Sequence, residues 1–456
     1  MKLRTLLRLT TLSVIAFPAC NDLEQTSAAD QDSFAPDSES DSQDAGHDVT
    51  QDDSQVDSSA LRERADALRQ RALEAGLVSL HSVELIELDP ELVELGRELF
   101  FDPILGGEED VACSTCHHPE LGFADNVAFP IGVGGIGIGA DRRYTADAHD
   151  NRPLGPLRPL GRSSPTVMNL QLLALEATER GLPTPFLWDG RADELSDFTQ
   201  MPITVRDEMR GDAWPQLNGM AGLIERLSTN DAWRARFVEV YELSPEESLG
   251  LQHLQRAFNA FMLSLVSPPN PLDDFLAGSN AASPEFLNGL ELFLDLSCVS
   301  CHTGVSLSDG GFHLTGVPIG ELSRPLAGGI DIGRMEITGR ERDRYMFRSG
   351  PLREIARTAP YMHNGAFETL EEVVRFYIGG SNPLSASSPP VADSRLERGT
   401  PRDLTAPEIA DLVLFLETLS TPADQLPALY PEPSQVPSGL TPSAVPLNQR
   451  AGLTMQ

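Results

Sequence analysis

Two short segments of this sequence combine cysteine and histidine at a fixed spacing. Cys113, Cys116 and His117 form one C-x-x-C-H, and residues 298–302 repeat it as "CVSCH". Two cysteines at this spacing can attach a porphyrin through thioether bonds, and the following histidine can then reach the iron. A zinc site would need four ligands, and a disulfide would leave the adjacent histidine without a role. The two motifs therefore predict two covalently bound haem c groups.

The second motif supplies the same set of ligands as the first. Cys298 and Cys301 would attach the second haem, and His302 would bind its iron as His117 binds the iron of the first haem. His118 directly follows the first proximal ligand and cannot reach the opposite face of that haem, so it has no predicted role.

A helix is predicted directly before each motif. The segments "LVELGRELFFDP" and "FLNGLELFLD" both repeat apolar residues at helical spacing. This duplication predicts two cytochrome c-type domains, mainly α with long loops, each with one haem. Residues 61–270 would form the N-terminal domain and residues 271–420 the C-terminal domain, with "SPPNPLDD" at the boundary.

The charge and the first residues bear on partners and location. The chain of 456 residues has 34 basic and 68 acidic residues, a net charge of -34, which excludes binding of nucleic acid through a general basic surface.

Residues 1–20 combine a positive start, an apolar run and Cys20, which predicts a signal peptide of lipoprotein type. The alternative is ordinary secretion with Cys20 as a spare thiol. We expect a periplasmic or cell-envelope protein that contacts the membrane only through a lipid at Cys20.

Two further segments are predicted to lie outside the domains. Residues 21–60 are rich in Asp, Ser and Gln with almost no large apolar residue, which predicts a disordered acidic linker. Residues 421–456 form a Pro-rich tail that would either wrap around the domains or fray.

The order of motifs resembles that of bacterial di-haem cytochrome c peroxidases and their MauG-like relatives, over roughly residues 90 to 420. The resemblance rests on "GRELFFDPILGG", "CSTCHHPELGFAD", "GRSSPTVMN", "FLWDGRADEL", "GLELFLDLSCVSCHTG" and "DRYMFRSGPLREIARTAPYMHNGAFETLEEVVRFYIGG". It implies that hydrogen peroxide binds at the first haem. Electrons would arrive through the second haem from a small soluble donor, such as a cytochrome c or a copper protein.

The resemblance also implies two catalytic residues. Glu208, in "VRDEMRGD", matches the family's acid and base for peroxide cleavage, although the residue alone could be a surface glutamate. Trp188 matches the tryptophan that the family places between the haems, a role compatible with core packing. The family's usual glutamine falls on Phe198, and Gln200 is out of register.

The resemblance further implies an open first haem. Classical peroxidases carry a loop histidine sixteen residues past the proximal one, and here this position is Val133, in the glycine-rich "PIGVGGIGIGADRRY". His149 is a weak substitute. The absence of a histidine at this position implies a first haem that is open without reductive activation, as in MauG-like members.

At the second haem the family's distal ligand lies fourteen residues after the histidine of "TAPYMHNG", His363, and this count reaches Tyr377. MauG-like proteins have a tyrosine here. A phenolate favours ferric iron more than a thioether does. The rival ligands are Met362, Met346 and Met335.

The family also binds one calcium ion, for which Thr358 and Pro360 match the carbonyl donors, while its usual asparagine falls on Ser163.

The leading hypothesis is a di-haem peroxidase. The alternatives are a MauG-like oxidase that modifies a partner protein and a non-enzymatic electron-transfer cytochrome.

Overall fold

Each C-x-x-C-H motif follows a capped helix, as the duplicated pattern predicts. In this computed structural model, α2 (Pro90–Phe101) precedes the first motif and α11 (Pro284–Asp295) precedes the second. Asp89 caps α2 by accepting a hydrogen bond from the Glu91 amide, and Ser283 caps α11 by accepting one from the Phe286 amide. Proline occupies the first position of both helices, where no amide donor is needed.

The structure describes residues 53–144, 152–181, 186–215, 218–244, 246–318, 330–379, 403–422 and 425–442. The predicted signal peptide with Cys20, most of the predicted linker, His149 and the end of the tail lie outside these residues. Within the described residues no helix combines the length and the apolar character needed to cross a membrane.

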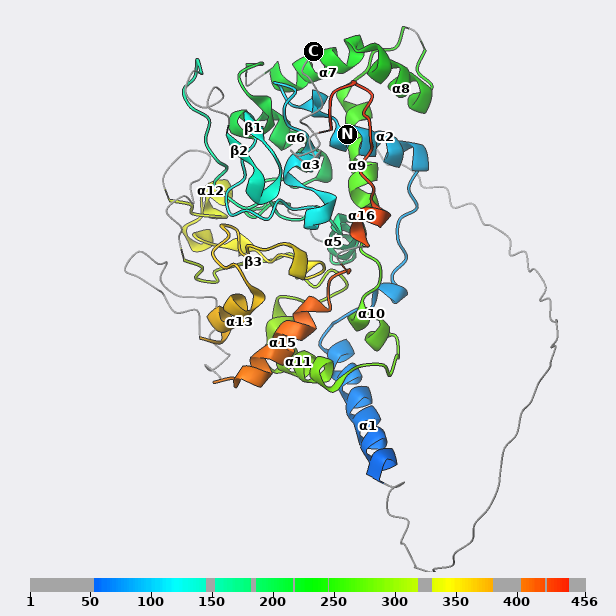
Figure 1. Cartoon of the computed structure of the whole chain (residues 1–456), viewed down its shortest axis with the longest axis vertical. Helices are drawn as coiled ribbons and strands as arrows, with labels where there is room; N and C mark the ends of the chain where they lie inside the picture. Colours follow the sequence, from blue (N-terminus) through cyan, green and yellow to red (C-terminus); the bar gives the residue numbers. More distant parts are fainter. Residues whose placement is uncertain are drawn as a thin grey trace, which may run out of the picture. The chain divides into compact units, whose positions relative to one another are not determined.

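The described residues are mainly helical, which confirms the mainly α character of the predicted fold class (Figure 1). Besides α2 and α11, the helices are α1 (Asp53–Glu74), α3 (Cys113–Cys116), α5 (Leu170–Glu179), α6 (Leu195–Thr204), α7 (Gly219–Thr229), α8 (Asp231–Tyr241), α9 (Leu251–Ser264), α10 (Pro271–Leu276), α12 (Met335–Thr338), α13 (Leu370–Ile378), α15 (Ala406–Glu417) and α16 (Leu426–Leu429). The part of the chain that the structure describes also contains two short antiparallel strand pairs: β1 (Gly135–Ile136) with β2 (Arg143–Tyr144), and β3 (Phe312–His313) with β4 (Phe347–Arg348).

The helix before each motif crosses a later helix at close range. In Figure 1, α2 packs against α9 and α11 packs against α15. A Cβ atom added at Gly96 in α2 would lie 2.1 Å from the Ala257 carbonyl oxygen, and one at Gly289 in α11 would lie 2.2 Å from the Asp411 carbonyl oxygen. Only glycine permits such an approach, so the same crossing occurs in both halves of the chain.

The two ends of the described chain pack on the opposite halves. The apolar face of α1, with Ala65, Leu68 and Ala72, is buried in the core around α11 and α15. Leu426 and Val436 of the tail are buried in the core around α2 and α9. This differs from the predicted boundaries, because α1 begins inside the predicted linker 21–60 and residues 61–77 join the core of the second half rather than that of the domain 61–270.

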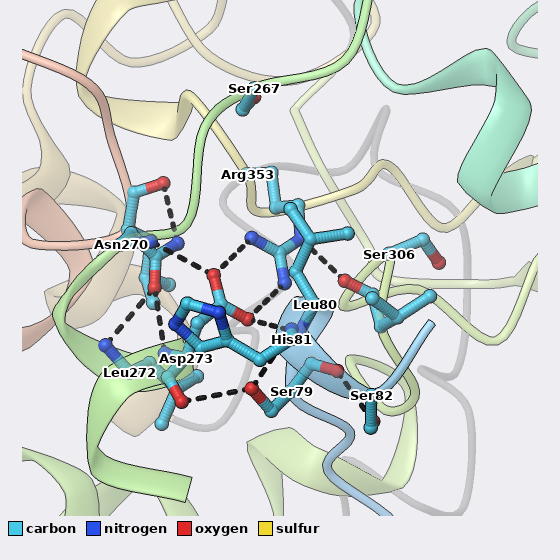
Figure 2. A network of polar contacts seen from close by, with 12 residues as sticks. Ser79, Leu80, His81, Ser82, Ser267, Asn270, Leu272, Asp273, Ser306 and Arg353 are labelled. Carbon is cyan, nitrogen blue, oxygen red and sulfur yellow. Dashed lines mark hydrogen bonds and ion pairs between the residues drawn. The ribbon is translucent and has the colours of Figure 1, made fainter. Parts of the chain in front are cut away.

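A buried ion pair joins three distant segments (Figure 2). Asp273 and Arg353 form a bidentate pair with both N–O distances at 2.7 Å, and both side chains are 1% exposed. The Leu80 amide donates to Asp273 at 2.7 Å, and the Asn270 amide donates to it at 2.9 Å. The segment after α1, the start of α10 and the loop at Arg353 are therefore fixed to one another.

Candidate active site

The first cavity, of about 110 Å³, lies beside the first motif. Cys113 and His117 line it from α3 and the residue that ends α3, and Trp188 lines it from the loop before α6. Glu208 lines it from the helical turn Arg206–Arg210. Apolar side chains, among them Phe100, Phe198, Phe258 and Met262, form much of the remaining wall. Four residues predicted for the first site therefore lie together.

The ring of His117 is oriented by a backbone carbonyl. Its Nδ1 lies 3.0 Å from the Phe123 carbonyl oxygen. A carbonyl only accepts, so Nδ1 carries the hydrogen and Nε2 has a free lone pair. Burial lowers the pKa of His117 to about 4, which keeps the ring neutral. This is the protonation state that an iron ligand needs.

The second cavity is larger, about 270 Å³, and repeats this arrangement. Cys298, Cys301 and His302 all line it. His302 Nδ1 lies 3.1 Å from the Leu307 carbonyl oxygen, and burial lowers the pKa of its ring. Both predicted proximal ligands are therefore neutral imidazoles whose Nδ1 lies against a backbone carbonyl.

The residues of both cavities fit haem. The four cysteines of the motifs are free thiols, available for thioether bonds. In the second cavity Arg348 is 8% exposed, and it donates to the Leu187 carbonyl at 3.1 Å and the Ser349 carbonyl at 3.4 Å. Burial lowers its pKa to about 10. A buried guanidinium bonded to neutral carbonyls beside a cavity suits an anionic group such as a haem propionate.

One other group of ligand-type side chains lies near the second motif. Cys301, Asp309 and His313 place one potential ligand atom each within 4.8 Å of one another, and His313 Nε2 lies 2.9 Å from Asp309. A metal ion bound there would leave Cys298 and His302 unused. Haem uses all three residues of the motif, so the structure favours the haem interpretation over zinc.

The backbone around Glu208 is fixed by close packing. A Cβ atom at Gly132 would lie 2.2 Å from the Glu208 carbonyl oxygen, and the Gly107 amide donates to the Met209 carbonyl at 2.7 Å. Burial raises the pKa of the Glu208 carboxyl, and the charge of Arg191 opposes this only in part. A carboxyl group whose pKa is raised toward neutrality can both take up and release a proton.

The glycine-rich loop does not bring a histidine to the first cavity. Val133 is fully buried, and Arg142 fixes the loop by donating to the carbonyls of Ile131, Gly132 and Gly137. Among the described residues that line this cavity, His117 is the only histidine. His118 lies elsewhere, with its Nε2 3.8 Å from a carboxylate oxygen of Glu432 in the tail.

Trp188 lines both cavities. Its indole Nε1 donates to the Ser163 carbonyl at 2.9 Å, and its own carbonyl accepts from the Arg348 amide at 2.8 Å. The next residue, Asp189, is fully buried and accepts from Arg162 at 2.6 Å. Arg162 also forms a bidentate pair with Asp331, at 2.7 Å for both contacts. The indole is therefore held at a wall that the two cavities share.

The structure separates the rival ligands of the second haem. Tyr377 and Met362 line the second cavity, while Met335 and Met346 are absent from its described lining. Burial raises the pKa of Tyr377, so the phenol is neutral unless a cation binds it.

The residues implied for calcium, Thr358, Pro360 and Ser163, also line the second cavity. The Ser163 hydroxyl donates to the Met362 carbonyl at 2.9 Å.

Sequence reasoning did not identify the arginines of the site. Arg162, Arg191 and Arg348 all line a cavity, and all lie inside segments that carry the family resemblance. Their place within these segments is the sequence feature that could have identified them.

The structure also shows which residue occupies the place of the family's usual glutamine. Phe198 lines the first cavity, whereas Gln200 is absent from its described lining and donates to the Ser196 carbonyl at 2.6 Å.

Known proteins are similar to this chain over most of its length. The sequence model of a family described as di-haem cytochrome c peroxidase matches residues 90–281. The chain is 32% identical to the methylamine utilization protein MauG of Methylorubrum extorquens, over 73% of this chain and 79% of that protein. It is 30% identical to cytochrome c551 peroxidase of Pseudomonas aeruginosa, over 72% of this chain and 78% of that protein.

Two solved structures are similar. A MauG-like protein associated with microbial copper homeostasis has a TM-score of 0.56 at 26% identity, covering 76% of this chain and 92% of its own. The di-haem peroxidase BthA of Burkholderia thailandensis has a TM-score of 0.53 at 21% identity, covering 74% of this chain and 88% of its own, which shows a common fold.

Proposed function

Because this chain belongs to the di-haem cytochrome c peroxidase family, we propose that it reduces hydrogen peroxide to water at the first cavity. Two electrons and two protons are consumed for each peroxide. The observation that carries this assignment is Glu208 in the cavity of His117, with Trp188 on the wall shared with the cavity of His302. A haem at each motif supplies the iron that binds peroxide in one cavity and passes electrons in the other.

The residues of the first cavity have separate roles in this proposal. Glu208 takes a proton from one peroxide oxygen and returns it to the departing oxygen. Arg191, on the same wall, favours the ionised form of the Glu208 carboxyl. The apolar wall excludes bulk water from the carboxyl. His117 would bind the iron of the first haem.

The second cavity receives the electrons. His302 binds its haem, Cys298 and Cys301 attach it, and Tyr377 is the proposed distal ligand, with Met362 as the alternative. Trp188 relays electrons across the shared wall. The donor is a small soluble cytochrome or copper protein, and the strongly acidic chain suits a basic one. Calcium bound through Thr358 and Pro360 remains part of this proposal, as does a periplasmic or envelope location with a lipid at Cys20.

Electron paramagnetic resonance of the purified ferric protein tests the assignment. A high-spin signal that disappears on addition of hydrogen peroxide supports an open first haem. Two low-spin haems that do not react with peroxide would instead show an electron-transfer cytochrome.

The variant Glu208→Gln then tests the proton transfer. It should retain both haems and lower kcat by about 10²- to 10⁴-fold, the usual contribution of general acid–base catalysis. Wild-type activity should rise with pH through the raised pKa of Glu208, because the base form grows above it. Glu194→Gln, at an exposed position, is the matched control. Unchanged turnover in Glu208→Gln would remove this residue from the mechanism.

A second candidate function follows from Tyr377 and the loop at Val133. Both match the MauG-like pattern, in which the enzyme oxidises residues of a partner protein. Rapid peroxide turnover with a small reduced donor supports the peroxidase. Peroxide-dependent oxidation of a partner protein, with negligible turnover of small donors, would support the MauG-like function.

A further inference from the structure

A buried carboxylate from the first half of the chain reaches the loop that orients His302. Glu176 lies on α5, and its side chain is buried. Its Oε1 accepts from the Val305 amide at 2.6 Å. The Ser306 amide donates to the same oxygen at 3.4 Å, and the Ser306 hydroxyl donates to Oε2. Three donors of one loop therefore converge on this carboxylate.

The same loop is held from its other side by Arg353. Arg353 Nε donates to the Val305 carbonyl, and the two terminal nitrogens bind Asp273. Figure 2 shows Arg353 between Asp273 and the segment that carries Ser306. Buried charged side chains therefore bind both backbone polar groups of Val305: Glu176 binds the amide and Arg353 binds the carbonyl.

This loop carries the carbonyl that orients the proximal ligand. Leu307, two residues after Val305, accepts the hydrogen bond of His302 Nδ1 at 3.1 Å. The length of that bond depends on where the backbone of residues 305–307 lies. The two side chains that fix Val305 therefore also fix the acceptor of His302.

We propose that Glu176 is a positioning residue for the second haem, which holds the Leu307 carbonyl against His302 and thereby sets the potential of that haem. The proposal rests on the proposed role of His302 as an iron ligand. A firm acceptor at Nδ1 makes the imidazole a better electron donor, and this stabilises ferric iron. The negative charge of the carboxylate favours the more positive iron as well. Both effects lower the potential of the second haem.

The decisive variant is Glu176→Gln in the full chain with both haems attached. A spectroelectrochemical titration that resolves the two haems should show a higher potential for the second haem and an unchanged potential for the first. The low-spin resonance of the second haem should shift with it. Glu179→Gln, at an exposed position on the same helix, should change neither potential. An unchanged second potential in folded Glu176→Gln would overturn the proposal.

A second variant tests the proposal even if Glu176→Gln does not fold. Ser306→Ala removes one donor to Glu176 and keeps the charge, so it should loosen the loop, raise the second potential by a smaller amount and speed hydrogen exchange at the Val305 amide. A lower unfolding temperature with both potentials unchanged would assign Glu176 a purely structural role and overturn the proposal. A wild-type protein that binds one haem would instead contradict the proposed function.

Discussion

The indole nitrogen of Trp188 donates a hydrogen bond to the carbonyl oxygen of Ser163 at 2.9 Å, and both residues line both cavities. The Trp188 carbonyl also accepts from the amide of Arg348, which lines the second cavity. The residue is therefore fixed at its ring and at its backbone. A rigid aromatic ring on a shared wall suits an electron relay between the two sites.

Replacement of Trp188 by phenylalanine should slow electron delivery to the first cavity. Phenylalanine keeps most of the apolar volume, but it is harder to oxidise and leaves the Ser163 carbonyl without its donor. We expect the steady-state peroxidase rate to fall by about tenfold or more, which corresponds to about 1.4 kcal/mol in the barrier. Stability should fall by about 1–3 kcal/mol, the usual cost of an unpaired buried polar group.

The control for that change is Trp214→Phe. Trp214 packs on Arg226, with the guanidinium carbon 4.2 Å from a ring centroid, and it lines neither cavity. Its replacement should leave the peroxidase rate unchanged. Equal rates for Trp188→Phe and the wild type in stopped-flow reduction would exclude the relay.

Tyr377→Phe should change the second haem alone. Iron binding must remove the phenol proton, whose pKa burial raises, so the bound form would be a phenolate that stabilises ferric iron. Loss of the phenolate should raise the potential of the second haem and alter its low-spin spectrum. Tyr361→Phe is the matched control, since Tyr361 lines the same cavity. An unchanged spectrum in Tyr377→Phe would favour Met362 as the ligand.

The sequence predicts most directly those features whose residues lie close together in the chain. Each C-x-x-C-H would supply its own anchors and ligand. The helix before it has its periodicity within twelve residues and its cap directly before them. Gly96 and Gly289 stand at matching places in the two repeated segments, so the duplication was also readable in the sequence.

The packing partners of the chain ends could not be predicted in this way. The apolar stripe of α1 shows that it is buried, but nothing in it selects the core of the second half over that of the first. Glu176 and Arg353 are likewise ordinary charged residues in the sequence. Their importance comes from meeting the two sides of Val305, which lies more than a hundred residues from Glu176.

The buried pair of Asp273 and Arg353 should make stability depend on pH. Burial opposes ionisation of Asp273, but the hydrogen bond and charge of Arg353 outweigh it and hold the pKa of Asp273 below its usual value. The stabilisation should therefore be complete above the ordinary aspartate pKa of about 4 and lost as pH falls below it. Urea unfolding between neutral and acid pH measures this dependence.

Removal of one partner of that pair should lower the free energy of unfolding more than removal of both partners. Arg353→Met leaves Asp273 buried and uncompensated, which should lower the free energy of unfolding by about 3–5 kcal/mol. The double variant Asp273→Leu with Arg353→Met replaces both charges by apolar groups and should recover part of that loss. A double variant less stable than Arg353→Met would show that the hydrogen bonds of Asp273 to Leu80 and Asn270 matter more than the ion pair.

The tail should stabilise the half of the protein that contains the first cavity. The Ser438 hydroxyl donates to the fully buried Asp102 at 2.6 Å, and Asp102 also accepts from the indole of Trp233 at 2.8 Å. Hydrogen bonds to charged groups contribute about 1.5–3 kcal/mol, so Ser438→Ala should lower the free energy of unfolding by about that amount. Ser434→Ala, at an exposed position in the same tail, should have no effect. Equal urea midpoints for the two variants would mean that Asp102 exchanges Ser438 for water without cost.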